Sequence, residues 1–187
     1  MNSMNKLVIT ALTLFTAVCA QADDYIIDGS GAGMHSSINF KASHVGISSL
    51  WGRFNDISGH FTYDADNIED SVIVVDINPA SIDTNHEARD IHLSSSDYVD
   101  VETYPVAGFR SNSIEDLGSG RVKVTGDFTL HGVTRSISFE AHRTGEGETP
   151  FGDYRVGFEG EMELNTNDYG INAGPLMLVL AIEGIRQ

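Results

Sequence analysis

Residues 121–143 read R-V-K-V-T-G-D-F-T-L-H-G-V-T-R-S-I-S-F-E-A-H-R. They consist of two segments in which apolar and polar residues alternate. Alternation with a period of two is typical of β-strands that bury one face. The segments meet at His131-Gly132, and a glycine between two such segments is typical of a hairpin turn, because glycine readily adopts a positive φ. We therefore predict antiparallel strands over 121–130 and 135–143.

The rest of the chain repeats this pattern at similar spacing. Further strands are predicted over 25–28, 37–43, 52–63, 71–78, 106–113, 153–164 and 176–185, with a short helical turn over 44–50 and a glycine-rich loop over 144–152. Short strands at this spacing are typical of a β-sandwich or a β-barrel. Because an open meander would leave two unpaired edges, we predict an all-β fold: an eight-stranded antiparallel lipocalin-like barrel with short helical excursions.

One polar segment interrupts the alternation. Residues 81–93 read S-I-D-T-N-H-E-A-R-D-I-H-L and follow Pro79, which lacks the N–H group that a strand interior needs. Asp83 or Thr84 is expected to cap a short helix, and Glu87 has the spacing of a capping box with Thr84. We expect this segment to lie at the mouth of the barrel.

The N-terminus has the pattern of a secretory signal peptide. Lys6 precedes an uncharged, mostly apolar run over 7–20, and the small-residue pattern Ala20-Gln21-Ala22 follows. A membrane anchor is the alternative, but a span takes about 20 apolar residues and this run is shorter. We predict a signal peptide over 1–22, one domain over 23–187 and a periplasmic location.

Cysteine and charge exclude several classes of function. The only cysteine, Cys19, lies in the predicted signal peptide, so the domain has no thiol for catalysis or metal binding. The net charge is −16, and removing Lys6 makes it one unit more negative. Such a surface repels nucleic acid and anionic lipid, so we expect neither a nucleic-acid partner nor stable membrane insertion. Charge leaves the choice between a monomer and a homodimer open.

The strand pattern defines an apolar inner face. Its predicted members are Ile38, Phe40, Phe54, Phe61, Val72, Val74, Phe128, Leu130, Ile137, Phe139, Phe158 and Met162, with Val106 turned the same way on its strand. An eight-stranded barrel has an interior that side chains fill or that holds one small ligand. Periodicity alone favours the filled core over an apolar cavity.

The polar segment offers three chemical interpretations. His86, Asp90 and His92 are candidate metal ligands, but His86 and Asp90 share a helix face that His92 does not, and a fourth ligand is not evident. Asp90 and His92 are also a candidate acid–base pair, without an accompanying nucleophile. We favour a hydrogen-bonded clasp that orders the segment. We expect no metal and no cofactor, and His44 is interpreted as a histidine at a strand end.

Six local patterns, in order, resemble those of the YceI family of periplasmic polyisoprenoid-binding proteins with a lipocalin-like barrel. They are Y-I-I-D at 25–28; H-S-S-I-N-F with S-H-V-G at 35–40 and 43–46; G-R-F at 52–54; S-I-D-T-N with R-D-I-H-L at 81–85 and 89–93; G-D-F-T-L-H-G-V-T at 126–134; and N-D-Y-G-I at 167–171. The matches run across the whole predicted domain.

This resemblance implies a long apolar tunnel that holds an isoprenoid or another long-chain lipid without catalysis. With this resemblance, we favour an apolar cavity over a core filled by side chains. The expected ligand-binding residues are Phe40, His44, Phe54, Phe61, Asp90, His92, Leu93, Phe128, Leu130, Phe139, Phe158 and Met162. An apolar tail needs few polar contacts, which agrees with the apparent absence of a cationic clamp for a head group.

Two other functions remain open at this point. One is an enzyme that acts on an isoprenoid lipid with Asp90 and His92 as its acid–base pair. The other is a stress-response interaction module with a filled core and no ligand.

Overall fold

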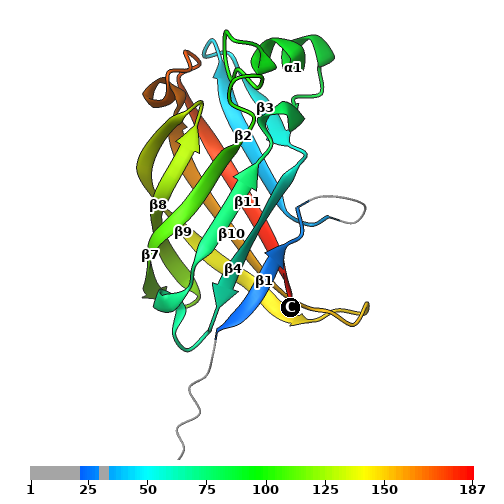
Figure 1. Ribbon diagram of the computed structural model, residues 1–187, viewed down its shortest axis with the longest axis vertical. Coiled ribbons are helices and arrows are strands. Elements are labelled where there is room, and N and C mark those ends of the chain that lie inside the picture. The colour runs from blue at the N-terminus through cyan, green and yellow to red at the C-terminus, as the bar shows by residue number, and fades with distance from the viewer. Residues whose placement is uncertain (1–21, 30–33) are drawn as a thin grey trace, which may run out of the picture.

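The computed structural model describes residues 22–29 and 34–187, which form an antiparallel β-barrel with one α-helix at its upper end (Figure 1). The predicted signal peptide falls almost entirely outside the described residues. The strands are β1 Asp23–Ile27, β2 Ser37–His44, β3 Ser48–Phe54, β4 Ile57–Tyr63, β5 Ile73–Ile77, β6 Ile82–Asp83, β7 Ala107–Gly118, β8 Arg121–Leu130, β9 Val133–Glu148, β10 Tyr154–Asn165 and β11 Pro175–Arg186. The helix α1 spans Glu87–Ser94, and short 3₁₀ turns are Ile68–Asp70, Pro79–Ser81 and Thr166–Tyr169.

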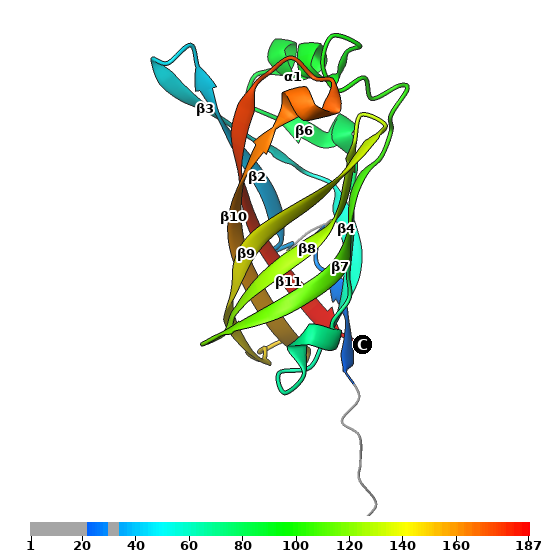
Figure 2. The same ribbon diagram turned by 90° about the vertical axis from the view of Figure 1, so that its left-hand side faces the viewer.

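Eight strands close the barrel in the order β1-β4-β5-β7-β8-β9-β10-β11, and β11 pairs back with β1. The predicted fold class is confirmed. The same edge of β11 also pairs with β2, from Leu176↔Ala42 to Ala181↔Ser37. Strands β2, β3 and β6 therefore extend the sheet beyond the barrel wall, and the β2–β3 hairpin projects outward at the upper end (Figure 2).

The hairpin predicted around His131-Gly132 is confirmed as β8 and β9. Their register runs from Leu130↔Val133 to Arg121↔His142, and both turn residues have positive φ, 51° and 72°. The return strand is longer than predicted. It continues through Gly145 and Gly147 to Glu148, where the glycines suggested a loop, because β10 supplies pairing partners along this length.

Two predicted elements around β3 are wrong. Instead of a helical turn over 44–50, residues 45–47 form a tight turn between β2 and β3, and 48–50 belong to β3. The Ile47 N–H donates to the His44 carbonyl at 2.9 Å. Residues 52–63 form the end of β3 and all of β4 instead of one strand. The break lies at Asn55-Asp56, whose two N–H groups donate to the carbonyl and hydroxyl of Ser81.

The inner face of β5 was predicted one residue out of register. Ile73, Val75 and Ile77 face the barrel interior, whereas Val72 is exposed. Val74 falls with Val72 outside the interior lining. Residues 72–75 are all apolar, so this part of the pattern selects neither face, and a shift of one residue exchanges the two faces. Asp76, between Val75 and Ile77, carried the signal for the correct face.

The same error occurs at the start of β7. Val106 precedes the strand and is exposed, whereas Ala107 and Phe109 are buried and line the cavity.

The polar segment folds as β6 followed by α1, above the barrel opening (Figure 1). Its N-cap differs from the prediction. His86 is the N-cap, and its Nδ1 accepts a hydrogen bond from the Arg89 N–H at 3.2 Å. Within the described ranges, the helices are too short or too polar to span a bilayer.

Candidate functional site

The barrel encloses a cavity of about 540 Å³. Its lining is predominantly apolar and comes from the wall strands β4, β5 and β7–β11 together with β2 and β3. The core is therefore not filled by side chains, contrary to what periodicity alone favoured.

Four aromatic rings close the lower end of this cavity, and we call them the floor: Tyr25, Phe61, Tyr63 and Phe158. Tyr25 stacks on Phe61 at a centroid distance of 5.1 Å, and Phe158 meets Phe61 and Tyr63 edge-on at 5.9 and 5.5 Å. Gly184 on β11 makes room for the Phe61 ring, because a Cβ there would lie 2.4 Å from Phe61 Cζ. Burial raises the pKa of Tyr25 from 10.0 to about 12, with Asp23 adding to the effect.

The upper end of the cavity, which we call the mouth, is covered by α1, the β2–β3 hairpin and the loop before β11. Arg89 and Leu93 of α1 line the cavity there, together with Ser43 and Leu50 of the β2–β3 hairpin and Asn172 of the loop before β11. Every residue of α1 is exposed or half-buried, so the helix lies over the opening without a packed core of its own.

The buried residue Thr84 holds α1 to β6. Asp90 Oδ1 accepts hydrogen bonds from the Thr84 N–H at 2.9 Å and from its hydroxyl at 2.5 Å. Arg89 donates from Nε to the Thr84 hydroxyl at 2.7 Å and from Nη2 to the Thr84 carbonyl at 2.8 Å. This arrangement confirms the clasp interpretation of the polar segment, and we call Thr84, Arg89 and Asp90 the clasp.

Most of the predicted site residues line the cavity. They are Phe40, Phe54, Phe61, Leu93, Phe128, Leu130, Phe139, Phe158 and Met162. His44, Asp90 and His92 lie outside the lining: His44 is exposed at the end of β2, and Asp90 belongs to the clasp. His92 lies 3.6 Å from Asp97 and meets the Tyr98 ring edge-on. Their contribution to ligand binding stays a prediction.

The candidate catalytic and metal sets do not assemble. In the described part of the chain, Asp90 and His92 have separate partners, and His86 serves as the helix N-cap. The sequence reasoning also missed a cation. Arg89 lines the cavity at the mouth, although no cationic group was expected there. The signal was present in the R-D-I-H-L pattern, where Arg89 directly precedes Asp90.

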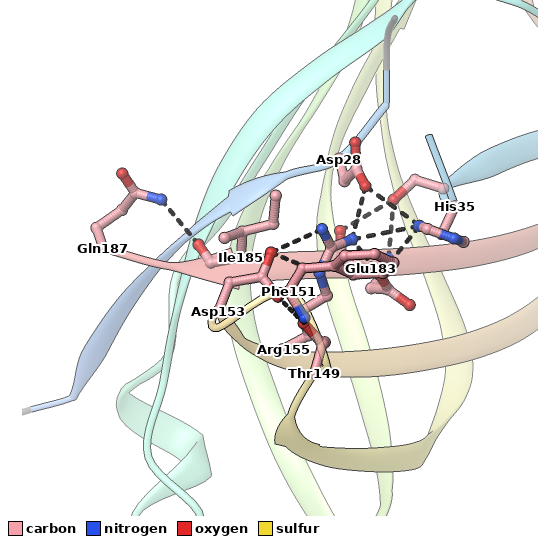
Figure 3. Close-up of polar contacts among 10 residues, drawn as sticks. Asp28, His35, Thr149, Phe151, Asp153, Arg155, Glu183, Ile185 and Gln187 are labelled. Atoms are coloured by element: carbon pink, nitrogen blue, oxygen red, sulfur yellow. Dashed lines mark hydrogen bonds and ion pairs between the residues drawn. The ribbon is translucent and has the colours of Figure 1, made fainter. Parts of the chain in front are cut away.

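A second polar cluster lies on the outer face of the barrel, around Arg155 (Figure 3). Arg155 Nη1 lies 2.7 Å from Asp28 and 2.5 Å from Glu183, and its Nη2 lies 2.8 Å from Asp153. His35 Nδ1 is 3.2 Å from the same Nη1. The cluster ties β10 and β11 to the chain at the end of β1.

The Arg155 guanidinium offsets part of the negative charge of the three carboxylates in this cluster. Hydrogen bonds from Arg155 and from the Thr149 hydroxyl lower the pKa of Asp153 from 3.8 to about 2, and Asp153 and Glu183 raise the pKa of Arg155. Asp28, His35 and Glu183 present donor atoms within 4.8 Å of one another, a spacing that suits a cation. Arg155 already supplies that positive charge, so we interpret the cluster as structural. Sequence reasoning missed it, although Asp28 and His35 belong to the quoted patterns.

The fold and cavity together define a class: lipocalin-like antiparallel barrels with an apolar interior. A family model described as a YceI-like domain matches residues 27–183, so the chain belongs to the YceI-like family. The resemblance inferred from the local patterns is confirmed.

Relatives and solved structures agree with this assignment. The UPF0312 protein of Shewanella sp. strain ANA-3 is 44% identical over 193 residues, covering 98% of this chain and 100% of that protein. The YCEI protein of Campylobacter jejuni has a similar structure, with 25% identity, a TM-score of 0.70, and coverage of 79% of this chain and 91% of that one. A polyisoprenoid binding domain from Saccharophagus degradans shares the fold at 16% identity and a TM-score of 0.65, covering 89% of this chain and 100% of that one.

Proposed function

We propose that this chain is a secreted periplasmic binding or carrier protein for a polyisoprenoid or another long-chain lipid. The observation that carries the proposal is the cavity of about 540 Å³ with its apolar lining. Ligand pockets typically measure roughly 300–1,000 Å³ and match the polarity of their ligands. A ligand without polar groups along its length suits this lining.

Burial of the tail supplies the driving force. Each buried CH₂ contributes about 0.8 kcal/mol, so a five-carbon isoprene unit contributes roughly 3–4 kcal/mol. Association costs about 4–15 kcal/mol in lost freedom of motion, which two to four buried units offset. The floor sets one limit to the tail, so the head group would lie toward the mouth, near Arg89.

The name of the Saccharophagus degradans domain supports a ligand of this class, since that domain shares the barrel fold. The arrangement at the mouth favours binding over catalysis. Asp90, the proposed acid–base group of the alternative enzyme, has its Oδ1 engaged by Thr84 and lies outside the lining.

The proposal is tested by native mass spectrometry of protein purified from its own host without detergent, followed by binding of geranylgeraniol. We expect a retained long-chain lipid that organic extraction removes, and saturable uptake of the probe by the extracted protein. A lipid-free mass together with no uptake of geranylgeraniol would contradict the proposal and favour an interaction module that binds no ligand.

Replacing one of two alanines with phenylalanine tests whether the ligand lies in the cavity. Ala141 lines the cavity and Ala88 is exposed on α1. We expect Ala141→Phe to fill part of the cavity and weaken geranylgeraniol binding by at least about tenfold, because several buried methylene groups of the probe are displaced. Ala88→Phe should bind like the wild type. Equal binding by both variants would place the lipid outside the cavity.

A further inference from the structure

The β2–β3 hairpin carries large apolar side chains that face solvent. Val45 is 76% exposed and Ile47 84% exposed at the turn, and Trp51 is 54% exposed on the outer face of β3. We call these three residues the apolar tip. The β2–β3 hairpin that carries them projects outward at the upper end of the barrel (Figure 2). We propose that the apolar tip docks reversibly on the surface of a lipid bilayer and brings the mouth of the cavity against it.

The charge of the hairpin differs from that of the rest of the molecule. The chain has 27 acidic residues and a net charge of −16, yet residues 29–55 contain none of the acids. The same stretch contains Lys41 and Arg53, and Arg53 is balanced by Asp83 at 3.9 Å. The hairpin is therefore the part of this acidic protein that approaches lipid phosphates with the least repulsion.

The outer face of the hairpin has the chemistry of a membrane interface. The Lys41 ammonium lies 5.6 Å from the centre of the Trp51 ring, on the strand paired with it. Tryptophan and lysine each combine an apolar body with a polar end, and both settle at the level of lipid head groups. A zwitterionic bilayer suits this face best, because the remaining surface would be repelled by an anionic one.

The turn holds the apolar residue Val45 in a strained backbone conformation. Val45 has φ 48° and Gly46 has φ 75°, and the Ile47 N–H donates to the His44 carbonyl. Hairpin turns with two positive φ values favour Asn-Gly, whereas a β-branched residue is strained in this region. Strain of this kind occurs most often at functional positions, so it supports a role for this turn beyond folding. Here that side chain is apolar and points into solvent.

The tip is continuous with the cavity. Ala42, Ser43 and Leu50 line the cavity, and they flank the turn that carries Val45 and Ile47. A bilayer that holds the tip would therefore lie next to the mouth. This inference rests on the proposed lipid ligand, because a water-insoluble lipid needs a path from a membrane into the cavity without crossing water.

Trp51 is the only tryptophan in the sequence, so it reports directly on docking. The experiment mixes wild-type protein with large unilamellar vesicles of phosphatidylcholine and phosphatidylethanolamine that contain no isoprenoid. We expect a blue shift of Trp51 emission, quenching by brominated lipids, and co-flotation of the protein. The tested variant is Val45→Asn with Ile47→Ser, which keeps a favourable turn sequence. Its vesicle affinity should fall at least about tenfold, because two apolar side chains are lost from the interface.

Two controls separate docking from folding. Phe151 is 86% exposed on the β9–β10 loop at the opposite end of the barrel, so Phe151→Ser should bind vesicles like the wild type. Val45→Asn alone should keep or raise the melting temperature while vesicle binding falls. Uptake of geranylgeraniol from solution should stay unchanged in every tip variant, because the tip lies outside the cavity lining.

The outcomes distinguish the two proposals. Unshifted Trp51 emission with vesicles, or equal vesicle binding by the double variant, overturns docking and leaves the lipid-binding function standing. Analytical ultracentrifugation tests a second copy as the partner. If the wild type is a dimer and the double variant is a monomer, the tip is a dimer interface, and docking on a bilayer is overturned. Absence of geranylgeraniol uptake from solution by the wild type overturns the lipid-binding function itself.

Discussion

The floor and the mouth of the cavity are closed by different kinds of contact. At the floor, aromatic rings from β1, β4 and β10 pack against one another, and Tyr25 is 2% exposed. At the mouth, a short helix without a buried residue among its described positions is held by hydrogen bonds to Thr84. Packed apolar contacts belong to the global fold, whereas segments with few such contacts open locally. The comparison teaches that the floor belongs to the packed core, whereas opening of the mouth is expected to cost less free energy.

The floor should be the more costly end to disturb. Phe61→Ala removes the ring that contacts Tyr25 and Phe158, and we expect a loss of about 3–5 kcal/mol in the free energy of unfolding. Urea denaturation measures it. The matched control is Phe151→Ala, an exposed phenylalanine whose removal should change stability by less than about 0.5 kcal/mol. Similar losses in both variants would remove the distinction between floor and surface.

A clasp variant should act locally and less strongly. Asp90→Ala leaves the N–H and hydroxyl of the buried Thr84 without their acceptor. We therefore expect the free energy of local opening of this segment to fall by about 1–3 kcal/mol. Hydrogen exchange should quicken over 84–94 while the floor strands keep their protection. The exposed neighbour provides the control, because His92→Ala should leave exchange over this segment almost unchanged. Faster exchange throughout β1 and β4 would show that the two ends are one cooperative unit.

The smallest effect at neutral pH is expected for Tyr25→Phe, which becomes informative in alkali. The unfolded tyrosine ionises near its ordinary pKa of 10.0, whereas the folded pKa is raised to about 12. The unfolded state therefore loses its proton first, and stability falls as the pH rises from 10 to 12. The melting temperature of the variant should fall less than that of the wild type over this window and match it at pH 7. Parallel curves would mean that the floor admits water.

Much of the wall could be predicted from the sequence, because alternation reports directly on half-buried strands. The hairpin of β8 and β9 and the inner face of β10 emerge from local pattern and glycine placement. The inner face of β5 was predicted wrongly from its apolar run over 72–75, although Asp76 marks the opposite face. The N-cap of α1 was also predicted wrongly, because His86 takes the position that Asp83 or Thr84 was expected to fill.

The site was predictable in its apolar part and less so in its polar part. Aromatic residues such as Phe128 and Phe158 were placed correctly in the lining, because strand alternation selects them. The Arg155 cluster joins residues more than one hundred positions apart, and local spacing carries no information about such contacts. Whether the interior is filled or hollow depends on side-chain packing in three dimensions, so periodicity favoured the wrong alternative.

The pairing of β11 with β1 has a consequence for how the protein forms. The register joins Tyr25 to Arg186 and Ile27 to Gly184, so the first described strand meets the last. Pairings between distant parts of a chain form late, because loop-closure entropy opposes them until other contacts are in place. The barrel thus lacks this wall contact until β11 has been synthesised. A chain cut before Gly184 would lose that contact, and its exposed apolar interior would then favour aggregation.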